Sequence, residues 1–316
     1  MITVLAGGVG AARYLAGLVQ VVEPAAITAI VNTGDDTTLH GLRICPDLDT
    51  VTYTLAGASN TALGWGLEGE TWQAMDALSR FEAHAPAGSA AGATWFRLGD
   101  RDLATHLYRT QRLVEGAPLS MVVTELATAW CLGLRLVPMT NDVVATMVTV
   151  AGEGEIGFQD YFVGRRHAVA VSGVRFDGIE RARPAPGVLE ALEQAERVVI
   201  APSNPVVSIG PVVAVPGVAE RLRARREQVV AVSPIVAGAA LKGPADRMLS
   251  ELGHEASVVG VARLYAPIVG TLVIDEADAS RAAEVEAAGV RCVVAPTVMT
   301  GPAEAAALAR TTLGVT

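Results

Sequence analysis

The chain has 316 residues, of which 51% are hydrophobic and 18% are charged. A chain of this length holds one large domain or two ordinary ones, which excludes a disordered protein, a collagen-like fibre and a disulfide-stapled miniprotein. The formal charge of −9, from 24 basic and 33 acidic residues, argues against a nucleic-acid duplex or an anionic membrane as partner, because no basic surplus exists to neutralise phosphates.

The N-terminal segment has the order of elements that opens an α/β unit. Ile2–Ala6 is a short apolar run and is predicted to be a strand, which ends in the glycines of residues 7–10. A helix is predicted over residues 11–22, and Ile27–Val31 is the next predicted strand. The loop of residues 32–36 follows the carboxyl end of that strand.

The middle of the chain has a different character. Residues from about 60 to about 130 are predicted to be mainly helical and contain all four tryptophans, with a flexible surface loop at residues 83–94. Residues from about 135 to about 175 alternate in the manner of antiparallel strands, most clearly at 143–150. We expect this part to shape a substrate site.

Strand–helix alternation returns near the C-terminus. The predicted strands are residues 197–201, 228–232, 270–274 and 290–294, and the predicted helices are residues 217–226, 244–252, 277–288 and 302–313. Apolar strands of this kind are typical of a parallel sheet covered on both faces. We therefore expect an α/β fold with a Rossmann-like, nucleotide-binding core of residues 1–60 and 185–316, into which a mostly helical substrate-binding region of residues 61–184 is inserted.

Targeting signals are not expected. The chain starts without the basic segment of a secretory signal, and the uncharged run of residues 198–219 contains four prolines, which a lipid-spanning helix would not tolerate. Three cysteines far apart in the sequence suit a reducing compartment. We expect a cytoplasmic protein with no membrane and no nucleic-acid partner.

The glycines after the first strand form the first candidate site. Gly7, Gly8 and Gly10 would let the backbone approach a phosphate at the start of the next helix. The pattern is neither a P-loop nor a full dinucleotide fingerprint, because Arg13 stands where a third glycine of the fingerprint would be. A phosphate site and an ordinary tight turn both remain open.

Four aspartates form the second candidate site. Asp35, Asp36, Asp47 and Asp49 lie on loops at strand ends, a pattern that suits Mg²⁺ beside a substrate phosphate. The alternative is that Asp47 or Asp49 caps a helix over residues 48–55.

Two further segments carry polar groups at chemically useful places. In residues 97–106, Arg97 and Arg101 could bind a carboxylate or a phosphate, although Asp-Arg-Asp at 100–102 is also typical of a solvated helix start. Residues 201–211 follow a predicted buried strand and offer Ser203, Asn204 and Ser208 as donors, where open α/β sheets bind ligands. The alternative for this segment is a rigid turn.

These segments, in this order, resemble the 2-phospho-L-lactate transferase family of coenzyme F-420 biosynthesis. The matching stretches are residues 5–13, 31–36, 40–50, 66–72, 95–112, 158–160, 201–210 and 233–236. Val9, Arg13 and the run of residues 40–43 resemble the actinobacterial branch, whose members look like phosphoenolpyruvate transferases.

The resemblance implies a reaction. The terminal ribityl hydroxyl of the deazaflavin Fo would attack a phosphoenolpyruvate or phospholactate that is activated as a GDP conjugate, and GMP would leave. Such a transfer needs positioning and charge neutralisation, for which Mg²⁺ is the expected cofactor. The resemblance also implies a homodimer.

The resemblance further implies a role for each matched residue. Nucleotide contacts fall on Gly7, Gly8, Gly10, Arg13, Ser203, Asn204, Pro205, Ser208 and Gly210. Asp49 matches the position beside the Fo ribityl end and Asp47 is its neighbour, so both are the expected catalytic residues. Asn32, Arg97, Asp100 and Arg101 are expected to contact substrate, and Asp35, Asp36, Asp47 and Asp49 to hold the metal.

Two other functions are compatible with part of the pattern. An NAD(P)-dependent oxidoreductase would place pyrophosphate on residues 7–10 and ribose on Asp35 or Asp36, but these acids lie past the strand tip and the third glycine is missing. A non-catalytic nucleotide sensor would have no evident need for Asp47 and Asp49 beside a glycine loop.

Overall fold

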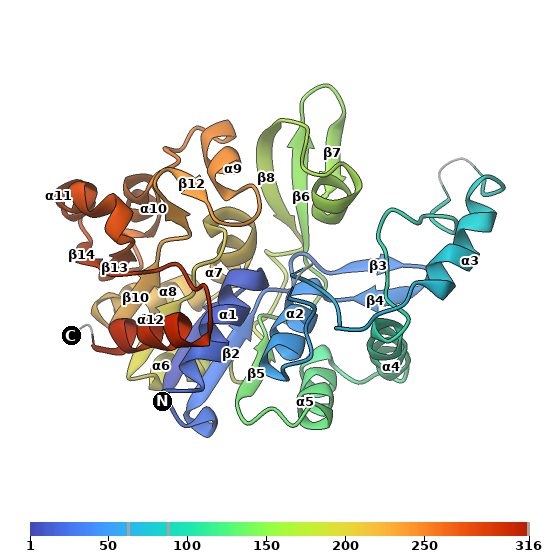
Figure 1. Ribbon diagram of the computed structural model, residues 1–316, viewed down its shortest axis with the longest axis horizontal. Helices are drawn as coiled ribbons and strands as arrows, with labels where there is room; N and C mark the ends of the chain where they lie inside the picture. The colour runs from blue at the N-terminus through green and yellow to red at the C-terminus, as the bar shows by residue number, and fades with distance from the viewer. Residues whose placement is uncertain (62–63, 87–88, 315–316) are drawn as a thin grey trace.

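The structure is a computed structural model that describes residues 1–61, 64–86 and 89–314. A seven-stranded parallel sheet runs through its centre (Figure 1), in the order β14-β13-β10-β9-β1-β2-β5. The strands are β14 (Arg291–Val294), β13 (Thr271–Ile274), β10 (Val229–Val232), β9 (Arg197–Ile200), β1 (Ile2–Ala6), β2 (Ile27–Val31) and β5 (Arg135–Pro138). The α/β fold and the parallel sheet are thereby confirmed.

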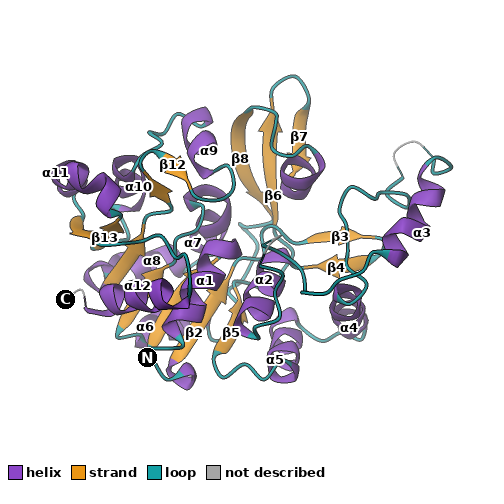
Figure 2. Cartoon of the chain, viewed as in Figure 1, coloured by secondary structure: helices purple, strands orange, loops and turns teal. Residues whose placement is uncertain are grey.

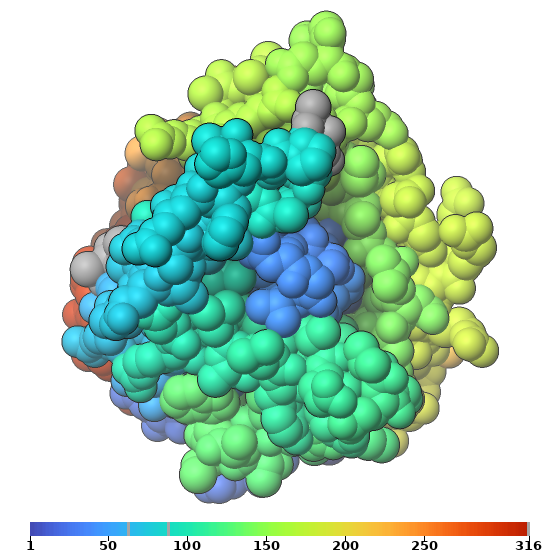
Figure 3. Space-filling view, turned by 90° about the vertical axis from the view of Figure 1, so that its right-hand side faces the viewer, coloured from blue at the N-terminus to red at the C-terminus, as the bar shows by residue number. Residues whose placement is uncertain are grey.

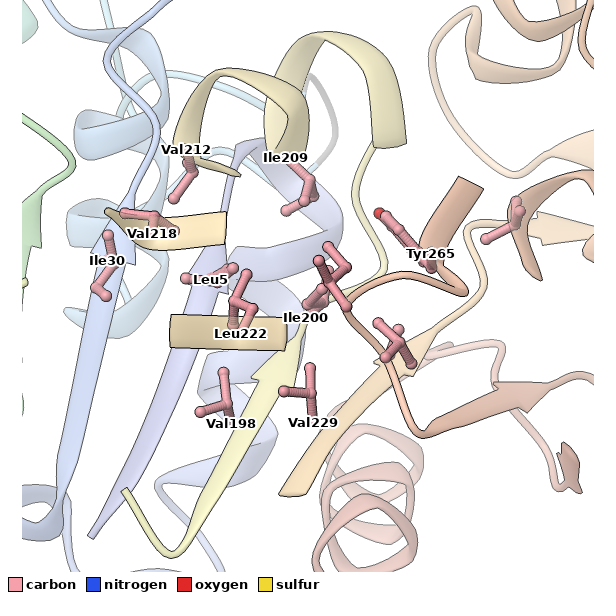
Figure 4. Close-up of a cluster of buried hydrophobic side chains, with 14 of the residues drawn as sticks. Leu5, Ile30, Val198, Ile200, Ile209, Val212, Val218, Leu222, Val229 and Tyr265 are labelled. Atoms are coloured by element: carbon pink, nitrogen blue, oxygen red, sulfur yellow. The ribbon is translucent and has the colours of Figure 1, made fainter. Parts of the chain in front are cut away.

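Alternation along the strands fills a core on each face of the sheet. Leu5 and Ile200 point into one core, which Figure 4 shows, whereas Val4 and Val199 point into the other. The first core is covered by α6 (Val188–Gln194), α7 (Gly210–Ala214), α8 (Val218–Ala224), α9 (Ala245–Glu251), α10 (Val258–Tyr265) and α11 (Ala282–Ala287). The second is covered by α1 (Gly8–Leu18), α2 (Pro46–Leu55), α5 (Leu119–Ala129) and α12 (Pro302–Gly314).

Local sequence explains where several helices begin. Pro46 opens α2, where its missing N–H costs nothing. The Ser257 side chain accepts hydrogen bonds from the backbone N–H groups of Val259 and Gly260 and so caps α10. Shorter helical turns are η1 (Pro24–Ala26), η2 (Asp160–Gly164), η3 (Pro205–Ile209), η4 (Arg226–Gln228) and η5 (Glu276–Arg281), and short strands β11 (Ile235–Val236) and β12 (Ala239–Ala240) pair with each other.

Two smaller units extend from the sheet. An antiparallel sheet of β6 (Ala145–Val150), β7 (Gly154–Gly157) and β8 (Val171–Asp177) rises at the top of Figures 1 and 2. An arm at the right of Figure 1 holds the hairpin β3 (Thr37–Leu39) and β4 (Leu42–Ile44) with α3 (Gln73–Glu82), and α4 (Asp102–Val114) lies below it.

The structure differs from the sequence-based predictions in several places. The predicted insert of residues 61–184 contains β5, which is an edge strand of the central sheet next to β2. The first helix begins at Gly8 rather than residue 11, and the helix predicted at 277–288 divides into η5 and α11. The described part of the loop predicted at residues 83–94 holds no helix or strand, while residues 87–88 lie outside the description.

Helix length bears on membrane crossing. Within the described ranges, no single helix is both long and apolar enough to cross a bilayer. In the part of the chain that the structure describes, one pair of helical segments, Pro205–Ala214 and Val218–Ala224, meets the length and composition requirement when taken together, but the pair is bent by 94°. Apolar side chains of both segments pack into the first core.

Candidate functional site

The candidate site lies at the carboxyl end of the sheet, where its strand order reverses. The chain moves from β1 through β2 to β5 in one direction, and from β9 through β10, β13 and β14 in the other. Open α/β sheets bind ligands at such a switch point. Figure 3 shows that blue residues from the N-terminal part of the chain lie between the cyan arm and green segments on this face.

The loop after β1 packs tightly against the loop after β9. The Ser203 Oγ donates a hydrogen bond to the Gly7 carbonyl at 2.7 Å. A Cβ on Gly7 would lie 2.7 Å from the Ser208 Cβ, and a Cβ on Gly10 would lie 2.1 Å from the Pro202 carbonyl oxygen. Glycine is therefore required at both positions so that the two loops can meet at the switch point.

The Asn204 side chain in the loop after β9 makes hydrogen bonds within that loop. The Asn204 side-chain oxygen accepts from the backbone N–H groups of Val206 at 2.9 Å and Val207 at 3.4 Å, and so caps η3. Pro205 opens η3, and a Cβ on Gly210 would lie 3.1 Å from the Phe176 ring. These contacts fix the loop and leave its use by a nucleotide open.

Arg13 differs from these residues because its side chain has no partner among the residues that the structure describes. It lies half-buried on α1, one turn after the glycine loop. In the part of the chain that the structure describes, its guanidinium makes no hydrogen bond and no ion pair. A cation without a counter-charge near a helix start is free to bind an anion.

Three aspartates gather beside the glycine loop, and we call Asp35, Asp36 and Asp47 the open acidic cluster. Asn32 Nδ2 donates to Asp47 Oδ2 at 2.9 Å, while its Oδ1 accepts from the Gly34 N–H at 2.8 Å. Asp47 also accepts from the Gly8 N–H. Asn32 thus orients Asp47 and the turn that carries Asp35, although the sequence suggested a substrate contact.

Charge is only partly balanced in the open acidic cluster. Arg43 Nη2 donates to Asp36 Oδ2 at 3.1 Å, and the Cys45 thiol donates to the same oxygen at 3.0 Å. Among the described residues, nothing hydrogen-bonds to the Oδ1 atoms of Asp35 and Asp36, although both atoms are buried. Buried acceptors without partners are costly, and they indicate a place for a ligand.

The environment of the open acidic cluster disfavours full ionisation. Burial raises the pKa of Asp47 to about 7, against the lowering effect of the Asn32 hydrogen bond. Burial also raises the pKa of Asp36 to about 6, against the lowering effect of Arg43. Burial, followed by the charge of Asp47, raises the pKa of Asp35 well above its usual range. Oxygen-rich, mutually repelling carboxylates with unpartnered oxygens fit Mg²⁺ by their chemistry.

Asp49 belongs to a second group, the closed network, which consists of Asp49, Asp102, His106, Arg109 and Tyr53. Arg109 binds both carboxylate oxygens of Asp49, with Nη1 at 3.1 Å from Oδ2 and Nη2 close to Oδ1. His106 Nε2 lies 3.3 Å from Asp102 Oδ2, and the Tyr53 hydroxyl donates to Asp102 Oδ1 at 2.5 Å. Asp49 therefore has a buried counter-charge, whereas Asp47 meets only neutral donors.

The closed network also offers ligand atoms at metal-binding distances. One atom each of Asp49, Asp102 and His106 lies within 4.8 Å of the others. Arg109 already neutralises Asp49, however, and a second cation beside a bidentate guanidinium would be repelled. Asp49 is therefore less available to a metal ion than its distances to Asp102 and His106 alone would indicate.

The helix-cap alternative for Asp47 and Asp49 is wrong. Helix α2 begins at Pro46 with Cys45 as its N-cap, and no side chain makes a capping hydrogen bond there. Both aspartates lie in the first turn, where a negative charge interacts favourably with the positive end of the helix dipole.

Residues on the arm have local partners. Arg97 donates to Asp76 at 2.7 Å and lies over the Trp72 ring, 5.2 Å from its centroid. Asp100 accepts from the backbone N–H groups at the start of α3, and Arg101 donates to the Glu68 carbonyl. Asp100 and Arg101 thus hold the arm together, whereas Arg97 forms a cation–π contact with Trp72.

Sequence reasoning found Asp49 but missed its partners in the closed network. The network residues on α4, Asp102, His106 and Arg109, share one buried helix face with Thr105. A polar stripe of this periodicity in the sequence could have indicated a buried polar helix face.

Comparisons with known proteins agree with one another. The family model for 2-phospho-L-lactate transferase CofD matches residues 2–297. Proteins named phosphoenolpyruvate transferase from Streptomyces griseus and Mycolicibacterium smegmatis are 47% and 39% identical, covering 99% and 98% of this chain and 97% and 96% of their own. A crystal structure of a UPF0052 family protein from Bacillus halodurans has a TM-score of 0.60 at 15% identity, covers 99% of this chain and 98% of its own, and shows the same fold.

Proposed function

The chain belongs to the 2-phospho-L-lactate transferase family, and from this premise we propose that it transfers the phosphoenolpyruvyl or phospholactyl group of a GDP-activated donor to the deazaflavin Fo. The family assignment makes the chain a transferase, and nothing in the comparisons supports the oxidoreductase alternative. The acceptor, the guanine nucleotide and the cation are parts of the proposal.

The reaction is a substitution at phosphorus. The terminal ribityl oxygen of Fo forms a bond to the phosphorus nearest the three-carbon acid, and the bond from that phosphorus to the GMP oxygen breaks. The hydroxyl proton leaves, GMP departs with the electron pair, and a phosphodiester remains. Such a transfer depends on in-line positioning and on charge stabilisation more than on covalent catalysis.

One observation carries the proposal: the open acidic cluster adjoins the glycine loop at the switch point of the sheet. Asp47 accepts hydrogen bonds from Asn32 and Gly8, so the carboxylate and the glycine loop lie in contact. The loop after β9 contacts the same glycines through Ser203. A diphosphate at the loops would place its reacting phosphorus beside Asp47.

The residues of the chain have distinct roles in this proposal. Asp35 and Asp36 would hold Mg²⁺ through their unpartnered Oδ1 atoms. When bound, Mg²⁺ supplies charge neutralisation for the diphosphate and the leaving group. Asp47 orients the acceptor hydroxyl and accepts its proton, a task for which a pKa of about 7 is suited. Arg13 binds the donor phosphate.

Mass spectrometry of the product tests the proposal. The purified chain is incubated with Fo and with either enolpyruvoyl-diphosphoguanosine or its lactyl analogue, and the mass of the deazaflavin product identifies the transferred group. We expect a phosphodiester of Fo and one equivalent of GMP. Unmodified Fo with both donors, in a sample whose folding is verified by circular dichroism, would contradict the proposed function.

A further inference from the structure

Arg109 is an unusual residue for a protein interior. It lies on α4, is only 1% exposed, and reaches from the inserted region to the first turn of α2. Its guanidinium binds both oxygens of Asp49 and donates to the Arg43 carbonyl at 3.2 Å. A buried guanidinium costs much desolvation, so a paired one is weak evidence of a stabilising role and calls for another explanation.

The geometry of α2 suggests that explanation. Residues two apart on an α-helix project about 200° apart around its axis, so Asp47 and Asp49 point to nearly opposite sides. Asp47 faces Asn32 and the glycine loop, while Asp49 faces α4. Leu48 and Val51 hold α2 in the second core, and no side-chain cap fixes its start. The contact between Arg109 and Asp49 adds an ionic restraint on the Asp49 side of the first turn, where His106 Nδ1 also lies 3.8 Å from Asp49 Oδ2.

The charges around Arg109 show what its pairing with Asp49 contributes. If fully ionised, Asp35, Asp36, Asp47 and Asp49 carry four negative charges, and Arg43 and Arg109 carry two positive ones. The net charge of −2 would be balanced by one divalent cation. Arg109 also acts on Asp36 by its field, in the direction opposite to Asp49.

We propose that Arg109 is a positioning residue: it holds Asp49 on the far side of α2, so that Asp47 faces the reaction and Asp49 stays out of the cation's surroundings. This inference rests on the proposed function and adds a residue of the inserted region to it. The closed network supports the restraint, because His106 and Asp102 lie next to Arg109 on α4.

The test combines variants of Arg109 with Mn²⁺ as a probe for the cation. Arg109→Met removes the charge, and Arg109→Lys keeps the charge but loses the two-pronged contact. The double variant Asp49→Asn with Arg109→Met removes both members of the pair. Arg112→Met is the matched control, because Arg112 lies on the same helix and pairs with Glu115 and Glu125 near the surface. Mn²⁺ binding is followed by electron paramagnetic resonance, beside turnover and thermal unfolding.

The proposal predicts changes of opposite sign. In Arg109→Met the freed Asp49 adds negative charge near Asp36, so Mn²⁺ should bind about tenfold tighter while turnover falls at least about tenfold. In Arg109→Lys turnover should fall while Mn²⁺ affinity stays within about twofold of wild type, and in the double variant Mn²⁺ affinity should return to the wild-type value. Arg112→Met should match wild type in both.

Other outcomes would overturn the proposal. If Arg109→Met weakens Mn²⁺ binding and turnover together, in step with a lower melting temperature, Arg109 is merely structural. If Arg109→Met does not fold, Arg109→Lys decides, and wild-type turnover in that variant would contradict a positioning role. A wild-type chain that binds Mn²⁺ but forms no Fo product would contradict the proposed function instead. The Mn²⁺ affinities of the Arg109 variants would then still test whether Arg109 keeps Asp49 away from the cation.

Discussion

Asp47 and Asp49 lie two residues apart on the first turn of α2, yet their surroundings are opposite. Asp49 has a buried guanidinium on both oxygens, whereas Asp47 has two neutral donors and two acidic neighbours. Identical side chains on one turn thus differ in counter-charge: a buried guanidinium pairs with Asp49, whereas Asp47 accepts from neutral donors. The neighbouring elements, α4 on one side and the glycine loop on the other, decide the difference.

The comparison shows two ways in which buried carboxylates are accommodated. In the closed network Arg109 pairs with Asp49, so breaking this pair should lower stability in addition to disturbing the position of Asp47. The open acidic cluster leaves buried oxygens without partners and raises the pKa of its carboxyls through burial. Such unfavourable environments are found preferentially at functional sites, because a ligand later supplies the missing interactions.

The largest expected effect comes from opening the closed network. Asp49→Asn keeps the size of the side chain but leaves Arg109 buried without its counter-charge. We expect the free energy of unfolding to fall by about 3–5 kcal/mol, measured by urea denaturation. A variant as stable as wild type would show that the ion pair with Arg109 does not hold in solution.

The next effect comes from neutralising the open acidic cluster. Asp47→Asn retains an acceptor for Asn32 but removes the charge, so turnover of Fo should fall at least about 10²-fold, or about 2.7 kcal/mol. The melting temperature of the metal-free protein should not fall, because a repelled buried charge has been removed. Near wild-type turnover would remove Asp47 from the mechanism.

A smaller effect is expected at the cation that faces the donor. Arg13→Ala should weaken donor binding by about 1.5–3 kcal/mol, because one charge-assisted contact is lost, and leave the melting temperature unchanged. Calorimetry with the donor or with GDP measures this. Unchanged affinity in the variant would make the glycine loop an ordinary turn.

The smallest effect is a pH dependence of stability. The pKa of Asp47 rises from 3.8 to about 7 on folding, so between these values the folded chain binds more protons than the unfolded chain. Stability of the metal-free protein should therefore decrease as the pH rises through this window, and Mg²⁺ should oppose the decrease. Thermal unfolding in chelator and in Mg²⁺ across the window measures both; a melting temperature that rises with pH in chelator would contradict the assignment.

The sequence predicted the parallel core well because its strands are continuous apolar runs. Ile2–Ala6 and Ile27–Val31 have the predicted bounds, and the four later strands agree to within one residue at either end. Strand β5 lies in the region predicted to be antiparallel strands, but its place in the central sheet was not predicted, because its four residues begin with an exposed arginine and end with proline, which weakens the signal of a buried parallel strand. Its place beside β2 is set by tertiary pairing.

The sequence predicted which aspartates lie at the candidate site, but not that they divide into two groups. Loop positions at strand ends indicated the four aspartates, as the topology of α/β sheets requires. Which aspartate has a counter-charge depends on Arg109, 60 residues beyond Asp49 in the sequence. Spacing along the chain carries no information on that contact, so Asp47 and Asp49 could not be told apart.

The most direct test of this account locates the cation. Mn²⁺ is titrated into wild type, Asp35→Asn and Asp102→Asn, and the bound ion is followed by electron paramagnetic resonance. The account predicts that Asp35→Asn, in the open acidic cluster, binds Mn²⁺ at least about tenfold more weakly, and that Asp102→Asn, in the closed network, stays within about threefold of wild type. Lost binding in Asp102→Asn with wild-type binding in Asp35→Asn would place the ion at Asp49, Asp102 and His106 and contradict the account.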